Sequence, residues 1–441
     1  MTRDSGRLGA RRNRAADGEY WREALTVLLV ATAPNNHRMA PETIVAIPAR
    51  DEAGSIGSCL SALAHQVGLD GKRLDGAAFG VVLLLNNCRD ATAEIARDFS
   101  RSLPYQVRIL LIELPAQLAH AGGARRFAMD AAADWVLEAK RADGYLLTTD
   151  ADTRVAPDWI VRQHVAFARG ADVVAGMVYD DPAEFRRLPT KLRRRGRLEA
   201  RYTWLLTEIE ARLDPDPDDP WPRHAMAPGA SLGVRLSWYR RVGGVPMLAC
   251  GEDRTLVSRL SAAGARVRHC LKTRVITSCR LEGRAAGGAA DTMRQRIAEP
   301  ESFCDAGLEP ALDAMRRYFW RGLLRRWHGE AWLADNHEWA PSLGLPAENA
   351  VDVAQLTDFA ALWEAVTSQS PQLVSRLLRP AELPEEISQA KRIVRMLRRG
   401  GLAPVPKDQV PHGVEYHLEL MRRHLALPGH RADKIGFENA A

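Results

Sequence analysis

Four short apolar runs, each followed by a polar loop and most by a helical pattern, constrain the fold of this chain more than any other feature. The runs are Thr43–Pro48, Val81–Leu85, Val107–Glu113 and Tyr145–Thr149. Unbroken apolar text such as Val81–Leu85 is typical of a parallel strand that is covered on both faces. Strands that alternate with helices predict right-handed crossovers. We therefore expect an α/β protein with a Rossmann-like, doubly wound mixed sheet, whose ligands bind beyond the carboxyl ends of the strands.

Composition narrows the class of protein without naming a function. The 441 residues suffice for two or three domains, and 46% hydrophobic with 26% charged residues is typical of a soluble globular protein. The net charge of +6 suits anionic substrates but does not call for nucleic acid. No apolar run approaches the roughly 20 residues of a membrane span. The six cysteines form no Cys-x-x-Cys pair, which favours free thiols and a cytoplasmic location over a zinc site.

The N-terminal segment superficially resembles a secretory signal, because five arginines among the first 14 residues precede the short apolar run Ala24–Val30. Acidic residues at 17, 19 and 23 interrupt this pattern. We therefore predict a poorly ordered extension over residues 1–40. The sequence pattern of residues 301–441 predicts helices and no strands.

Two aspartates end the strand at Tyr145–Thr149, and they are the first candidates for chemistry. Asp150 and Asp152 lie one residue apart where the chain leaves the sheet, so both can turn toward one point. Two carboxylates repel each other there unless a cation lies between them, and hard oxygen ligands suit Mg²⁺ or Mn²⁺. The alternative is that the pair merely caps the next helix.

An ordered set of motifs resembles family-2 glycosyltransferases with the GT-A fold, from Thr43 to about Arg296. The set comprises Ile47-Pro48-Ala49-Arg50-Asp51-Glu52, Asn86 to Thr92, Gly122 to Arg126, Asp150-Ala151-Asp152 and Gly251-Glu252-Asp253. About 100 residues separate the first loop from the aspartate pair, and about 100 more separate that pair from Glu252-Asp253. The resemblance implies a GT-A catalytic domain over 41–300, with a nucleotide half at about 41–152 and an acceptor half at about 153–300, followed by a helical region over 301–441.

The resemblance also implies where a nucleotide diphosphate sugar binds. Pro48, Ala49 and Arg50 would line the nucleotide, and Glu52 would accept hydrogen bonds from the ribose hydroxyls. Asn86 departs from the aspartate that reads uracil in many relatives. Because an amide both donates and accepts, contact with the base remains possible. The resemblance makes a UDP-sugar the favoured donor, with a GDP-sugar as the alternative.

Metal and base residues follow from the same resemblance. Asp152, with Asp150 beside it, would hold Mn²⁺ or Mg²⁺ on the diphosphate, although Asp150 could instead contact the ribose or sugar. Asp253 would be the base of an inverting transferase, with Glu252 orienting the acceptor or the sugar. The alternative for this acidic pair is a favourable helix N-terminus.

Three arginines are further candidates for binding the donor. Arg125 follows two glycines at a helix start and could reach the diphosphate, or could be a surface arginine beside a tight turn. Arg280 and Arg284 flank a glycine-rich loop that would close over the diphosphate. The Gln-x-x-Arg-Trp motif of processive synthases is absent, which favours a non-processive enzyme.

The acceptor is not readable from the sequence and could be a small molecule, a saccharide or a lipid-linked compound. The basic, aromatic stretch at 316–327 fits either a helix packed by its aromatic side or peripheral contact with the inner face of a membrane. The helical region would shape the acceptor cleft, mediate homodimerisation or touch that membrane. Two other functions compete, namely a sugar nucleotidyltransferase and a non-catalytic binding or scaffold protein.

Overall fold

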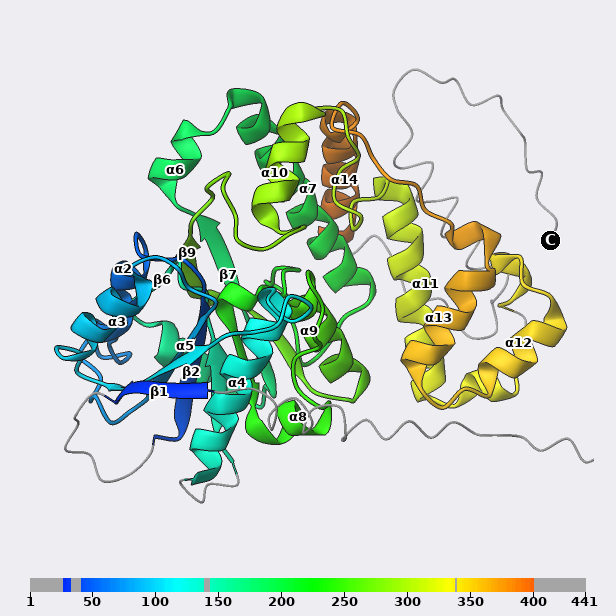
Figure 1. Ribbon diagram of the computed structural model, residues 1–441. Helices are drawn as coiled ribbons and strands as arrows, with labels where there is room; N and C mark the ends of the chain where they lie inside the picture. The colour runs from blue at the N-terminus through cyan, green and yellow to red at the C-terminus, as the bar shows by residue number, and fades with distance from the viewer. Residues whose placement is uncertain (1–26, 33–40, 139–142, 338, 400–441) are drawn as a thin grey trace, which may run out of the picture. The chain divides into compact units, whose positions relative to one another are not determined.

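The computed structural model describes residues 27–32, 41–138, 143–337 and 339–399 (Figure 1). The chain forms two compact units. Unit 1 comprises the residues up to Pro189 together with Arg223–Ala298, and unit 2 comprises Thr190–Pro222 together with the residues from Glu299 onward.

Unit 1 is built on a nine-stranded mixed sheet in the order β1-β4-β3-β2-β5-β8-β7-β9-β6. The strands are β1 Val27–Thr32, β2 Thr43–Ala49, β3 Gly80–Asn86, β4 Gln106–Ile112, β5 Tyr145–Thr148, β6 Thr153–Val155, β7 Val173–Asp180, β8 Leu232–Arg235 and β9 Val267–Thr277. The central strands β2 to β5 are mutually parallel, whereas β8 is antiparallel to both β5 and β7. The predicted α/β class with a doubly wound mixed sheet is confirmed.

Both faces of this sheet are buried, as the unbroken apolar strands predict. Alternate residues of β2 point to opposite sides: Ile44 and Ala46 join one core, and Val45 and Ile47 join the other. The unit 1 helices are α2 Ile56–Ala64, α3 Thr92–Ser100, α4 Ala121–Glu138, α5 Trp159–Ala168, α6 Pro182–Arg187, α8 Leu236–Arg241, α9 Glu252–Ala262 and α10 Ala289–Ala298. Helices α4, α8 and α9 cover the first face, and α2, α3 and α5 cover the second.

Unit 2 consists of helices and connecting loops, with no strand among its described residues. Its helices are α7 Thr190–Leu213, α11 Ala311–Gly329, α12 Ala347–Ala354, α13 Phe359–Gln369 and α14 Leu383–Arg398, with short 3-10 turns at η2 Trp332–Ala334, η3 Pro341–Leu343 and η4 Pro371–Leu373. Residues 190–222, which lie within the predicted catalytic domain over 41–300, belong to this unit. The reason is packing: Tyr202, Leu206 and Ile209 of α7 share one apolar core with α11 and α14.

Helix α11 contains the basic, aromatic stretch that left two interpretations open. Trp320 and Trp327 are fully buried in the core of unit 2. Arg321 and Arg325 both pair with the buried Asp214. The structure therefore favours a helix packed by its aromatic side, and these tryptophans are not available as membrane anchors. None of the described helices combines the length and hydropathy that a membrane crossing requires.

The N-terminal segment differs from its prediction in one stretch. Residues Val27–Thr32 form β1, which pairs antiparallel with β4 through Val27 opposite Ile112. A poorly ordered extension over 1–40 was therefore wrong for these six residues. The rest of that prediction, at 1–26 and 33–40, lies outside the described residues. All six cysteines carry free thiols.

Candidate active site

The polar loops that follow the parallel strands meet at one edge of the sheet. Strand pairing sets Ala46 beside Thr148 and Ala49 beside Leu85, so β2, β3 and β5 end close together. The loops beyond them carry Glu52 and the aspartates at 150 and 152. Because β8 runs antiparallel to β5, its preceding turn η1 (Gly229–Ser231) enters the sheet at this same edge.

Glu52, Asp152 and Arg280 form an ion-pair cluster in a cleft of about 300 Å³. The guanidinium of Arg280 donates to both carboxylate oxygens of Glu52, with Nη1 2.9 Å from Oε2. Its Nη2 lies 3.2 Å from Oδ2 of Asp152. Ser55 Oγ donates to Glu52 over 2.6 Å. The cleft is lined by Asp51, Glu52, Gly54, Ser55, Ser58, Asp152, Arg154, Glu184, Ser278, Arg280 and Arg284.

This cleft carries more negative charge than Arg280 alone neutralises. Burial, together with the nearby Asp150, raises the pKa of Asp152 to about 7; Arg280 opposes this shift and Glu52 adds to it. A group of carboxylates with an unbalanced charge, open to a cleft, is a place where a cation is stabilised. Hard oxygen donors of this kind fit Mg²⁺ or Mn²⁺. Among the described residues, no three His, Cys, Asp or Glu side chains are already arranged as a metal site.

Arg125 occupies a different place from the one predicted. It is 5% exposed, in the first turns of α4, and each of its guanidinium nitrogens donates to a protein acceptor. Nη2 lies 2.8 Å from Oδ1 of Asp150 and Nε lies 3.1 Å from Oε1 of Glu252. Nη1 donates to Thr148 Oγ1 over 3.1 Å and to the Gly229 carbonyl over 3.0 Å. The alternative of a surface arginine does not describe this buried side chain, and contact with the diphosphate stays a prediction.

Glu252 and Asp253 open α9 after Gly251, whose φ of 74° is a left-handed conformation that glycine adopts readily. Glu252 is buried against Arg125. Oδ2 of Asp253 accepts the backbone N–H of Gly229 over 2.7 Å. The acidic pair thus meets the turn before β8 and, through Arg125, the end of β5. The contacts of Glu252 and Asp253 therefore extend beyond a favourable interaction with the N-terminus of α9.

The other predicted nucleotide-binding residues are dispersed around this edge. Pro48 and Ala49 belong to β2, and Arg50 donates to the Ala119 carbonyl over 3.1 Å. Asn86 is the last residue of β3 and only 2% exposed. Arg284 reaches the cleft, where Nη2 donates to the Asp51 carbonyl over 2.8 Å.

Several site residues were missed from the sequence. Asn87 adopts a left-handed backbone with φ of 52°, and its side chain donates to and accepts from the backbone of Leu114. The pair Asn86-Asn87 after an apolar strand was a signal for such a turn. Gly229, Ser278 and Thr148 carry no local signal, because their roles depend on partners far along the chain.

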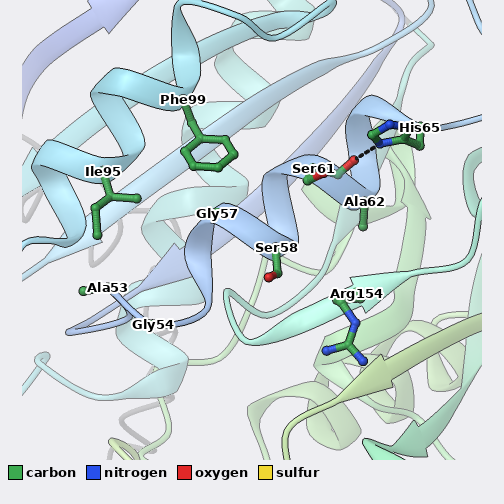
Figure 2. Close-up of a pocket in the computed structure, with 10 residues that line it drawn as sticks. All are labelled: Ala53, Gly54, Gly57, Ser58, Ser61, Ala62, His65, Ile95, Phe99 and Arg154. Atoms are coloured by element: carbon green, nitrogen blue, oxygen red, sulfur yellow. Dashed lines mark hydrogen bonds between the residues drawn. The ribbon is translucent and has the colours of Figure 1, made fainter.

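A second, more open hollow of about 560 Å³ lies on the outer side of α2. Figure 2 shows Ile95 and Phe99 of α3 on one side of it and Ser61 and His65 of α2 on another. It shares Gly54, Ser58 and Arg154 with the cleft, so the two hollows are continuous along the first turns of α2.

Comparison with known proteins defines the class. The profile described as Glycosyl transferase family 2 matches residues 44–217, the segment that supplies β2, β3, β5 and their loops. This match identifies residues 44–217 as a family 2 glycosyl transferase segment, and it supports a glycosyltransferase over the nucleotidyltransferase and scaffold alternatives. The α/β fold of unit 1 agrees with the GT-A type that the resemblance implies. A comparison with curated protein sequences found no match.

Three solved glycosyltransferase structures are similar to this chain at low sequence identity. TarS residues 1–349 of S. aureus, in complex with UDP-GlcNAc, is 16% identical with a TM-score of 0.41, over 83% of this chain and 94% of that chain. The mannosyltransferase PcManGT of Pyrobaculum calidifontis, in complex with GDP-Man and Mn²⁺, is 16% identical with a TM-score of 0.36, over 93% of this chain and 94% of that chain. Glucosyl-3-phosphoglycerate synthase of Mycobacterium tuberculosis, in complex with Mg²⁺ and UDP, is 13% identical with a TM-score of 0.31, over 62% and 83%.

Proposed function

We propose that this glycosyltransferase moves a sugar from a nucleotide diphosphate sugar to an acceptor hydroxyl, with a divalent metal ion and with inversion at the anomeric carbon. One observation carries the proposal. A polar cleft around Glu52, Asp152 and Arg280 lies at the edge of the sheet, and Asp150, two residues before Asp152, pairs with Arg125, which also pairs with Glu252.

The donor would enter the cleft by exchanging its own groups for the ion pairs there. Ribose hydroxyls would donate to the Glu52 carboxylate, and phosphate oxygens would accept from Arg280 and Arg284. A UDP-sugar is the favoured donor, with a GDP-sugar as the alternative that the assay must include. The base itself would lie toward Asn86 at the end of β3.

The carboxylates of Asp152 and Asp150 would hold Mn²⁺ or Mg²⁺ against the diphosphate. The surplus negative charge around Asp152 supports this assignment. Such an ion stabilises the negative charge that develops on the leaving diphosphate. Asp150 would at the same time keep its bond to Arg125 through Oδ1.

Asp253 would act as the general base. Its carboxylate would take the proton from the acceptor hydroxyl as that oxygen attacks the anomeric carbon. The bond between the anomeric carbon and the phosphate oxygen breaks in the same step, and a single displacement inverts the configuration. The bond from the Gly229 N–H supports this role, because it holds the carboxylate in one orientation.

The test is turnover of UDP- and GDP-sugars by the full chain with and without Mn²⁺, measured as release of the nucleoside diphosphate. Proton NMR of the first-formed product gives its anomeric configuration. We expect Asp152→Asn to lose metal-dependent nucleotide binding, and Asp253→Asn to keep binding while kcat falls by about 10²–10⁴. Asp158→Asn is a matched control, because that carboxylate pairs with Arg162 on α5. Retained configuration, or turnover that ignores the metal, would contradict the proposal.

The acceptor, a cytoplasmic location, homodimerisation and peripheral membrane contact stay predictions. Incubation of the active enzyme with saccharide, lipid-linked and small hydroxyl acceptors would separate the three acceptor classes.

A further inference from the structure

Arg125 connects the two halves of the proposed reaction without facing its substrates. We propose that Arg125 is a positioning residue that holds the donor-side carboxylate of Asp150 and the acceptor-side segment Glu252-Asp253 in one fixed arrangement. This inference rests on the proposed function and assigns a role that differs from donor binding.

The saturation of the guanidinium excludes a direct role with the donor. Its nitrogens donate to two carboxylates, a hydroxyl and a backbone carbonyl at 2.8–3.1 Å. The side chain is 6% exposed. A phosphate could bind Arg125 only if it displaced these bonds and opened the packed end of α4.

The acceptors of Arg125 come from three separate segments. Thr148 and Asp150 lie at the end of β5, Gly229 precedes β8, and Glu252 begins α9. The planar guanidinium presents its donors in a rigid fork, so these segments share one geometry. Moving any one of them stretches bonds to the others.

Gly229 extends this arrangement to Asp253. The Gly229 carbonyl accepts from Arg125, and its N–H donates to Oδ2 of Asp253. A Cβ on Gly229 would lie 2.5 Å from Nη2 of Arg125, so the close approach requires glycine. The backbone at this one residue therefore transmits the position of Arg125 to the proposed base.

The charges around Arg125 also make the arrangement of these segments depend on this residue. Asp150 and Glu252 both accept from Arg125, and Asp253 accepts from the N–H of Gly229, whose carbonyl also accepts from Arg125. Loss of this one cation would leave three neighbouring carboxylates that repel each other. They would then separate or bind protons.

Neighbouring Arg126 offers a matched control. It lies on the same helix, is largely buried, and pairs with Asp130 over 2.7 Å. It also donates to the backbone carbonyls of Gly243 and Val245. Both arginines thus lock α4 to other segments, but only the Arg125 network includes residues of the proposed site.

The experiment compares Arg125→Lys, Arg125→Ala and Arg126→Lys in the full chain. For Arg125→Lys we expect kcat to fall about 10²-fold, while the donor KM and the affinity for the nucleoside diphosphate change by less than about threefold. We expect Arg125→Ala to lose more, and Arg126→Lys to keep kcat. Amide hydrogen exchange should quicken at residues 229–232 and 251–254 in the Arg125 variants, and not in Arg126→Lys.

Two results would overturn the inference. A donor KM that rises with kcat unchanged would make Arg125 a donor-binding residue, and equal losses of kcat in Arg125→Lys and Arg126→Lys would make its role merely structural. If the wild-type protein turns over no nucleotide sugar, the proposed function fails. Hydrogen exchange would still decide whether Arg125 holds the two segments, because unchanged protection refutes the inference without any turnover.

Discussion

Substituting alanine for Gly229 should damage catalysis more than stability. The added Cβ would lie 2.5 Å from Nη2 and 2.8 Å from Nε of Arg125, whereas ordinary contact begins at 3.4 Å. Because Cζ of Arg125 would lie closer still, the guanidinium must move by about 1 Å. Its bonds to Asp150 and Glu252, now 2.8 and 3.1 Å, would stretch beyond the usual range for a hydrogen bond. We expect a loss of roughly 1–3 kcal/mol in the free energy of unfolding.

The larger effect should appear in turnover, because a misplacement of about 1 Å costs about 10²-fold in rate. Steady-state kinetics of Gly229→Ala with saturating acceptor would measure it. Gly144→Ala is the matched control: its Cβ would lie 2.9 Å from the Glu42 carbonyl oxygen and closer still to Val136, at the opposite end of β5. We expect the control to lose comparable stability and no kcat. The reasoning is refuted if both variants keep wild-type kcat, or if both lose it equally.

Three further predictions concern charge. The raised pKa of Asp152 means that the folded, ligand-free protein holds a proton there up to about pH 7. Mn²⁺ affinity, measured by calorimetry, should therefore be about tenfold weaker at pH 6 than at pH 8, and a pH-independent affinity would contradict this. The stabilising effect of Asp152 on the folded state should also decline as the pH rises from about 4 to 7. Glu52→Gln should raise the donor KM by about 10–100-fold with little change in kcat, because Arg280 and the ribose lose a charged acceptor. An unchanged KM would show that Glu52 does not bind the donor. In unit 2, Asp214→Asn should lower the free energy of unfolding by roughly 2 kcal/mol, because Arg321 loses a buried charged partner. A denaturant titration measures this, and an unchanged free energy would show that solvent replaces the carboxylate.

The elements of unit 1 were largely predictable, and the reason is local. Apolar runs such as Val81–Leu85 had no alternative to burial on both faces, and the structure has them as central parallel strands. Because the side-chain period of a strand and the position of its end are set by neighbouring residues, the grouping of Glu52 and Asp152 at one edge also followed.

Some boundaries required the tertiary structure. Helix α7 was recognisable as helical text, but its membership of unit 2 depends on the partners of Tyr202 and Leu206 in α11 and α14. Strand β1 was hidden within a segment that looked like an extension, because its pairing partner β4 lies far along the chain.

What the sequence alone determined is therefore the class of fold, the order of its elements and the carboxylates at the edge of the sheet. Only the tertiary structure decided the partners of the arginines. Arg280 meets Glu52 from 228 positions away, and Arg125 meets Glu252 from 127. The position of Arg125 after two glycines predicted a ligand-binding residue, yet its side chain is buried and holds the site together. The physical reason is that a long side chain binds whichever acceptors the packed chain brings within about 3 Å, and no local pattern encodes that meeting.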